Sequence, residues 1–226
     1  MSERGRIIVL DDFYAEPEKT REFALSHDYR SAAAYNYPGW QSAKMLHSPA
    51  LLDLFGELTN SRVDVDFNSF TFGGFRLATE ATGRLANVHA DQAADWAGLV
   101  YLTPDAPDSA GTGFFRHRAT GLERPPTDAE ARADGYGDAF AYEQAAIIPD
   151  YPDPTAWELM EWVAPTYNRL ILFQGCELYH ASLGGCGSTP ADARLTHNFF
   201  FNEIAHRGPV SLRDGSRRED PVCVGY

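Results

Sequence analysis

Apolar residues recur at two different spacings along the chain, and these spacings separate helical parts from strand-like parts. Residues 6–10 (RIIVL) form a short run rich in β-branched side chains. Beyond it, apolar residues at helical spacing follow Pro17, so we expect an amphipathic helix with this proline in its first turn. Residues 49–57 (PALLDLFGE) predict a second short helix, whereas residues 31–49 show no regular pattern.

From residue 62 onward, β-branched and aromatic residues dominate, in short runs or in alternation with polar residues, as is typical of strands. The strand-like segments are VDVDF, NSFTFGGFRLAT, VHADQ, WAGLVYLT, GFFRHR, NRLILFQG, LYHASL and RLTHNFFFNE. We expect one helix to interrupt them at DPTAWELMEW, with Asp153 as its cap and Pro154 as its first residue. This order predicts an α+β protein, mainly β, built around an antiparallel sandwich or barrel.

The length fits a single domain over residues 1–226, within which two segments stand apart. Residues 119–154 combine prolines, glycines and many acids with one weak helical pattern near TDAEARA. An irregular stretch of this length inside a compact domain often carries function, so we expect a lid or a substrate-facing insert. Residues 207–226 are polar and unpatterned, which predicts a tail or a surface wrap.

Composition and charge narrow the possible partners. The chain has 19 basic and 32 acidic residues, and its formal net charge of −13 argues against binding nucleic acid. No apolar run approaches the roughly 18 residues that would span a bilayer, so we expect no membrane partner. The run IIVL near the start is too short for the core of a signal peptide. Three cysteines make no disulfide framework, so we expect a reducing, cytoplasmic location.

The candidate chemistry begins with a pair of metal-ligand side chains. His89 and Asp91 are two residues apart, and such positions on a strand point to the same face. His180 follows a later apolar strand and would supply a third ligand from a distant part of the chain. Two histidines and one carboxylate on one face of an octahedral ion suit Fe(II), whereas structural zinc prefers four closed ligands. Taken singly, His180 is better explained as a core or turn histidine, and a His-x-Asp tripeptide often arises by accident.

A cation follows this trio on the last strand. Arg194, Thr196 and Asn198 would share one strand face, with Leu195 and His197 on the other. A guanidinium on an inward face needs a partner, and a carboxylate would satisfy it with a bidentate pair. The alternative is an edge-strand arginine in water.

Together these motifs resemble the Fe(II)/2-oxoglutarate-dependent dioxygenase superfamily, which shows His-x-Asp, a distal His and then Arg-x-Thr in this order. The chain is similar more narrowly to the prolyl-4-hydroxylase-like branch, and to an uncharacterised bacterial subfamily of it. IIVLDDFYAEPEKTREFAL resembles the opening strand and helix of that branch, and LVYLTPDAPDSAGTGFF resembles its Tyr-Leu-Asn segment and Gly-Gly-x-Thr-x-Phe strand. The resemblance covers about residues 6–28 and 84–203. Thr103 departs from the usual Asn, and Arg194 from the Lys of many prolyl hydroxylases.

The resemblance implies a double-stranded β-helix (jelly-roll) with N-terminal supporting helices. It implies an enzyme that uses Fe(II), 2-oxoglutarate and O2 to hydroxylate an unactivated C–H bond of a small molecule, amino acid or peptide, with release of succinate and CO2. The implied metal ligands are His89, Asp91 and His180. The residues implied to hold the far carboxylate of 2-oxoglutarate are Arg194, Thr196 and Tyr101. Asp91 stands where related halogenases have a small residue, which favours hydroxylation or another oxidation over halogenation.

Four further residues are candidates for contact with the substrate. If Thr112 faces inward, strand alternation turns Arg116 and Arg118 inward too, where they would bind a carboxylate or phosphate; otherwise they form a solvated strand end. Trp96 would wall a substrate pocket, and Asn198 lies on the same strand face as Arg194.

Two other functions remain open at this point. The first is a non-catalytic metal-binding jelly-roll that binds or senses a ligand. The second is a cupin-like enzyme that uses the same metal ligands without 2-oxoglutarate.

Overall fold

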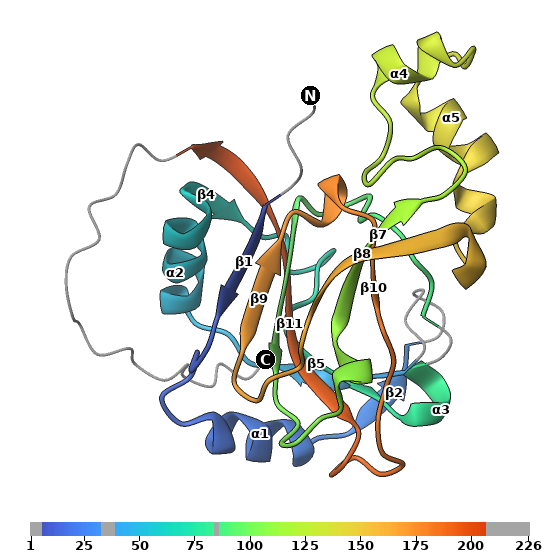
Figure 1. The fold of residues 1–226 in the computed structure, drawn as a ribbon. Helices are drawn as coiled ribbons and strands as arrows, with labels where there is room; N and C mark the ends of the chain where they lie inside the picture. The colour runs from blue at the N-terminus through green and yellow to red at the C-terminus, as the bar shows by residue number, and fades with distance from the viewer. Residues whose placement is uncertain (1–5, 33–38, 84–85, 207–226) are drawn as a thin grey trace.

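The structure is a computed structural model that describes residues 6–32, 39–83 and 86–206. Within these residues the protein is mainly β, and its strands form two antiparallel sheets (Figure 1). The large sheet has the order β1 (Ile7–Leu10), β9 (Leu170–Phe173), β6 (Trp96–Tyr101), β11 (Arg194–His206), β5 (Phe72–Ala78), β3 (Trp40–Met45), β2 (Tyr29–Ser31), and β4 (Ser61–Asp64) pairs with β11. The small sheet has the order β10 (His180–Ser182), β7 (Thr112–His117), β8 (Trp157–Val163). The predicted α+β, mainly β class is confirmed.

Side-chain alternation along the central strands gives the large sheet two different faces. On β11, Leu195, Phe199 and Phe201 pack with the N-terminal helices in one apolar cluster. On the neighbouring strand β6, Ala97 and Tyr101 point the other way and pack toward the small sheet. One face is therefore a helix-covered core, and the other encloses the space between the sheets.

Helices α1 (Pro17–Leu25) and α2 (Pro49–Thr59) form where the sequence predicts them. The Ser48 side chain caps α2 by accepting a hydrogen bond from the Leu51 N–H, and Asn60 ends the helix in the left-handed conformation. Phe55 on α2 contacts two aromatic rings of β11, with ring centroids 5.0 Å from Phe199 and 5.6 Å from Phe201. This contact attaches the helix to the large sheet.

Two predictions about local structure are wrong. The expected helix at 153–162 is a single 3₁₀ turn, η4 (Pro154–Ala156), followed by strand β8, although Asp153 does cap the turn. The expected irregular segment 31–49 contains β3. In both cases the strand forms because it pairs with a neighbour: β8 pairs with β7, and β3 pairs with β5. This pairing overrides a local sequence pattern that does not itself favour a strand.

The segment 119–154 folds mostly into short helices at one corner, beyond β7 and β8 (Figure 1). The expected helix near TDAEARA is confirmed as α4 (Asp128–Ala133), which Thr127 and Glu130 cap reciprocally, and α5 (Ala139–Ala146) follows it. Short turns complete the structure: α3 (Glu80–Gly83), η2 (Asp108–Ala110), η3 (Ile148–Asp150) and η5 (Gly175–Glu177). Among the described residues, no helix has both the length and the apolar character needed to cross a membrane. The predicted tail, 207–226, lies outside the described residues.

A buried histidine joins β11 to the segments that precede α1 and α2. His197 is fully buried, its ring stacks on Phe75, and its Nε2 lies 2.9 Å from the carbonyl oxygen of Leu46. Because a carbonyl only accepts, Nε2 carries the proton, and Nδ1 accepts the hydrogen bond from the Tyr14 hydroxyl at 2.7 Å. Burial lowers the pKa of His197 to about 3.

This histidine predicts an acid-sensitive fold. The folded pKa lies below the ordinary value of 6.5, so folding favours the neutral form, and stability falls as the pH drops from 6.5 toward 3. We expect His197 alone to contribute a loss of about 1.4 kcal/mol per pH unit in this window. Urea unfolding at several pH values would measure the slope. His197→Gln should lower stability at pH 7 but give a shallower slope; an unchanged slope would contradict the assignment.

Candidate metal centre

Two histidines far apart in the chain are held directly opposite each other by the backbone. The N–H of His180 donates to the carbonyl of His89 at 2.8 Å, and the N–H of His89 donates to the carbonyl of His180 at 3.1 Å. This reciprocal pair forms an isolated antiparallel bridge, so His89 does not lie on the regular strand that the sequence predicts. The bridge brings the two ring centroids to 4.7 Å.

Each imidazole is oriented by the carbonyl two residues before it. Nδ1 of His89 lies 3.0 Å from the carbonyl oxygen of Asn87, and Nδ1 of His180 lies 2.9 Å from that of Leu178. Since a carbonyl only accepts, both Nδ1 atoms carry the proton when the rings are neutral. Each Nε2 then carries a lone pair. Metal-binding histidines commonly have this arrangement, with one ring N–H donated to a carbonyl and the other ring nitrogen left for the metal.

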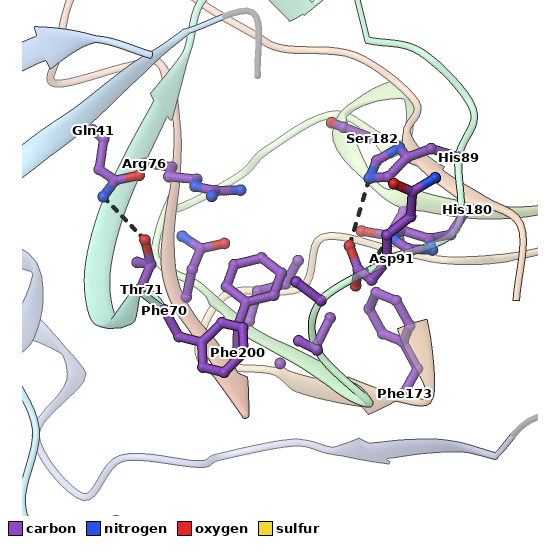
Figure 2. Close-up of a pocket in the computed structure, with 18 of the residues that line it drawn as sticks. Gln41, Phe70, Thr71, Arg76, His89, Asp91, Phe173, His180, Ser182 and Phe200 are labelled. Atoms are coloured by element: carbon purple, nitrogen blue, oxygen red, sulfur yellow. Dashed lines mark hydrogen bonds and ion pairs between the residues drawn. The ribbon is translucent and has the colours of Figure 1, made fainter. Parts of the chain in front are cut away.

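Asp91 completes the group and is anchored by a glycine. Its N–H donates to the carbonyl of Gly175 at 2.9 Å, on the turn that follows β9. Its Oδ1 lies 3.7 Å from Nε2 of His89, and its Oδ2 lies 3.9 Å from Nε2 of His180 (Figure 2). A Cβ built on Gly175 would lie 2.0 Å from Oδ2, so only glycine leaves room for this carboxylate.

The electrostatics of the group favour neutral imidazole at His180. This side chain is only 9% exposed, and burial lowers its pKa to about 4 in spite of the nearby Asp91 carboxylate. At neutral pH its Nε2 therefore presents a lone pair. Within the described part of the chain, Oδ2 of Asp91 is buried without a hydrogen-bond partner. A buried carboxylate oxygen in this state is costly unless another ligand satisfies it.

The three side chains fit a divalent ion. Their donor atoms all lie within 4.8 Å of one another. Two ligand atoms about 2.1 Å from one ion lie about 3 Å apart when they occupy adjacent octahedral positions, so the three side chains would move inward by about 1–2 Å to close around an ion. Two imidazoles and one carboxylate leave coordination positions open, a pattern typical of non-haem Fe(II). The sequence prediction that these three residues converge is confirmed.

Arg194 lies in the same region and is almost completely buried, with 3% of its surface exposed. Its Nε donates to the carbonyl of Ala110 at 2.6 Å, and Nη2 lies 3.5 Å from the hydroxyl of Thr112. Among the described residues no carboxylate pairs with it. A buried guanidinium without a counter-charge is expensive, so the region favours an anionic ligand.

Tyr101 and Thr196 lie behind this guanidinium and bond to its neighbours. The Tyr101 hydroxyl is 2.7 Å from that of Thr112, and its ring centre is 5.3 Å from the Arg194 guanidinium carbon. The Thr196 hydroxyl is fully buried and hydrogen bonds to the Asn198 side chain. Neither Tyr101 nor Thr196 lines the cavity, but each bonds to a residue that does. Thr112, Arg194 and Asn198 line the cavity itself.

A cavity of about 620 Å³ connects these groups between the two sheets. Figure 2 shows His89, Asp91 and His180 on one side of it, and Gln41, Thr71 and Arg76 on the opposite side. Its apolar walls include Leu99, Phe70, Phe173 and Phe200. Pockets for small organic ligands commonly have volumes of about 300–1,000 Å³, so this one has room for more than one small molecule.

Three candidate substrate residues lie elsewhere. Trp96 is fully buried on the helix-covered face of the large sheet, because alternation on β6 turns it away from the cavity that Ala97 and Leu99 line. Arg116 donates to Glu123 at 2.6 Å and lies 3.7 Å from Glu158.

Arg118 is exposed, and its Nε donates to the carbonyl of Trp157. β7 pairs with the His180 strand only as far as Phe114, so both arginines lie beyond the cavity. Only Asn198, of the four candidates, lines it.

The cavity also contains residues that sequence reasoning missed. Arg76 and Gln41 lie opposite each other on the paired strands β5 and β3, and both reach the cavity. Gly175 carries no motif, and only its contact with Asp91 reveals its importance. The cavity lining includes no residue of 119–154, so the lid function of that segment stays a prediction.

The fold and the site thus define an antiparallel β protein with a partly buried His-Asp-His candidate metal centre in the cavity between its sheets. A family model described as a family of unknown function, DUF6445, matches residues 1–201. The chain belongs to this family. A search of curated proteins found no match.

Proposed function

We propose that this protein is a non-haem Fe(II)- and 2-oxoglutarate-dependent dioxygenase built on a double-stranded β-helix. In this proposal His89, Asp91 and His180 hold Fe(II), and the bound metal with 2-oxoglutarate and O2 supplies the oxidising power for hydroxylating a C–H bond. The substrate is a small molecule, amino acid or peptide, and the coproducts are succinate and CO2.

The observation that carries the proposal is a buried cation in the same cavity as a partly buried carboxylate–imidazole trio. Arg194 lines the same cavity as the three candidate ligands and has no carboxylate partner among the described residues. A dicarboxylate such as 2-oxoglutarate would serve both groups. One of its ends would bind the metal, and the carboxylate at the other end would form a bidentate pair with the Arg194 guanidinium.

The protein's own residues prepare the cavity in two ways. The carbonyls of Asn87 and Leu178 hold the Nδ1 protons, so that both Nε2 atoms are kept as acceptors at the centre. Thr112 and the carbonyl of Ala110 hold the guanidinium of Arg194 in place before any ligand arrives. Such preorganisation reduces the cost of binding and orienting a cosubstrate.

The cosubstrate part of the proposal is tested at Arg194. Anaerobic protein with Fe(II) and 2-oxoglutarate should show a weak visible charge-transfer band, and aerobic protein should release succinate in an Fe(II)-dependent reaction. Arg194→Gln should weaken 2-oxoglutarate binding about 10- to 150-fold, since a hydrogen bond to a charged group contributes about 1.5–3 kcal/mol. Titration of the band measures this affinity.

The exposed Arg62 on β4 offers a matched control, because Arg62→Gln removes the same charge from a residue that does not line the cavity. Its 2-oxoglutarate affinity should stay at the wild-type value. If Arg194→Gln also binds 2-oxoglutarate like the wild type, a cupin-like protein without this cosubstrate becomes the better interpretation. Absence of the band together with tight zinc retention would favour a non-catalytic metal-binding protein.

A further inference from the structure

The 119–154 segment binds the backbone directly before each of the two candidate ligand histidines. The N–H of Val88 donates to the carbonyl of Tyr151 at 3.2 Å. The N–H of Tyr179 donates to the carbonyl of Glu123 at 3.0 Å. The two distant parts of the chain that supply the histidines are therefore both hydrogen bonded to the same segment.

The side chains that flank the two histidines pack against this segment as well. These flanking residues are buried and do not line the cavity, whereas the histidines do: Val88, Ala90, Tyr179 and Ala181. They form one apolar cluster with four residues of the 119–154 segment, Leu122, Ala146, Ile147 and Tyr151. Since neighbouring residues of an extended backbone point to opposite sides, the ligands face the cavity and the segment packs behind them.

Tyr151 adds a side-chain connection between the ligands and helix α5. Its hydroxyl donates to Oε1 of Glu143 on α5 at 2.8 Å. The backbone of Ala90, which lies between two candidate ligands, interacts with the same hydroxyl. The Tyr151 ring centre lies 6.4 Å from that of Tyr179 on the other side of the histidine bridge. Tyr151 therefore contacts both parts of the chain that supply ligands.

The end of the segment is itself fixed to the small sheet. The carbonyl of Asp150 accepts a hydrogen bond from the indole N–H of Trp157 on β8 at 2.9 Å. Its Oδ2 lies 3.0 Å from Nε2 of the buried His117 on β7. Since Asp150 directly precedes Tyr151, these two contacts hold Tyr151 against the sheet.

We infer that the 119–154 segment positions the metal ligands from the side that faces away from the cavity, with Tyr151 as the positioning residue. This role differs from that of a lid, which would cover the cavity. The inference rests on the part of the proposed function that assigns a metal to the three ligands, and it does not depend on the cosubstrate. Residues that hydrogen bond a ligand directly change metal affinity about 10- to 100-fold, and Tyr151 acts through the backbone, so we expect a smaller effect.

Tyr151→Phe tests this role because it removes the hydroxyl and keeps the ring. In full-length protein it should weaken Zn(II) binding about 3- to 10-fold, since the metal must then order backbone that the lost hydrogen bond had held. Glu143→Ala should have a similar effect, whereas Glu143→Gln keeps an acceptor and should restore most of the affinity. Calorimetric titration measures the affinities. The visible absorption spectrum of the Co(II)-loaded protein reports the ligand geometry and should change in Tyr151→Phe.

Tyr142→Phe is the matched control. The Tyr142 hydroxyl also donates to a carboxylate of the same segment, Asp134, at 2.6 Å, but Tyr142 lies outside the apolar cluster behind the ligands. Urea unfolding of the metal-free proteins should show similar losses of stability for Tyr142→Phe and Tyr151→Phe. Only Tyr151→Phe should change the Zn(II) affinity and the Co(II) spectrum. If both variants weaken Zn(II) binding equally, the effect is a general loss of stability in the segment, and the inference is overturned.

Amide hydrogen exchange in the wild-type protein gives a second measurement that needs no variant. Because coupling between two sites is reciprocal, bound Zn(II) should slow exchange in α5 as well as at the ligands. The inference is overturned if Zn(II) leaves α5 exchange unchanged, or if Tyr151→Phe binds Zn(II) as the wild type does. Failure to bind 2-oxoglutarate would contradict the proposed function and leave these results intact, because every measurement uses the metal alone or no metal. A wild-type protein that binds neither Zn(II) nor Fe(II) would end both.

Discussion

Asp91→Ala should weaken divalent-metal binding more than about 100-fold, because loss of a residue that only orients a metal ligand already costs about 10- to 100-fold. Asp91 contributes the only carboxylate among the three candidate ligands, and its Oδ2 is buried without a hydrogen-bond partner in the described structure. The variant removes both the ligand and an unsatisfied buried charge. Calorimetric titration of the protein with Zn(II) and with anaerobic Fe(II) measures the affinity directly.

The stability of the metal-free protein distinguishes this role from a structural one. Removing a largely buried carboxylate whose Oδ2 has no hydrogen-bond partner in the described structure should leave the metal-free variant at least as stable as the wild type. Asp53 lies exposed on α2, so Asp53→Ala serves as the control that removes the same charge without touching the centre. Wild-type metal affinity in Asp91→Ala would remove Asp91 from the site, and the proposed function with it.

Gly175→Ala is expected to displace the Asp91 carboxylate and weaken metal binding by at least about tenfold. The added methyl would lie 2.0 Å from Oδ2 and 2.9 Å from Cγ of Asp91, distances at which one of the groups must move. Overpacking of this kind also costs about 1–3 kcal/mol of folding stability. Metal titration and urea unfolding measure the two effects separately.

Two comparisons make this result specific. A Cβ built on Gly137 would have no neighbouring atom within 4 Å, so Gly137→Ala should change neither metal affinity nor stability by much. In the Asp91→Ala background the closest clashing atoms are gone, so Gly175→Ala should destabilise the double variant less than it destabilises the wild type. Equal destabilisation in both backgrounds would show that the methyl clashes with something other than the carboxylate.

Local pattern was sufficient where a segment's own residues decide its structure. Pro17, Ser48 and Thr127 mark helix starts that the structure contains, since proline and capping side chains act on the nearest backbone groups. The alternation on the last strand was also predicted, with Arg194 and Asn198 toward the cavity and Leu195 toward the helices.

Local pattern failed where pairing between distant segments decides. WELMEWV resembles a helix after a capped start, but alignment with β7 makes it strand β8. The same dependence explains the misplaced Trp96, Arg116 and Arg118. Which side of a sheet a side chain reaches depends on register and on where a neighbouring strand ends, and neither is encoded in the spacing of a few residues.

The sequence by itself determined the mainly β class, the first two helices and the three candidate metal ligands, because propensity, capping and the types of the ligating residues are local properties. Only the tertiary structure decided that His89 and His180 share a backbone bridge, that Gly175 leaves space for Asp91, and that Arg76 faces the same cavity. These relations join residues far apart in the chain, and they arise from strand register and close packing, which depend on the whole chain at once.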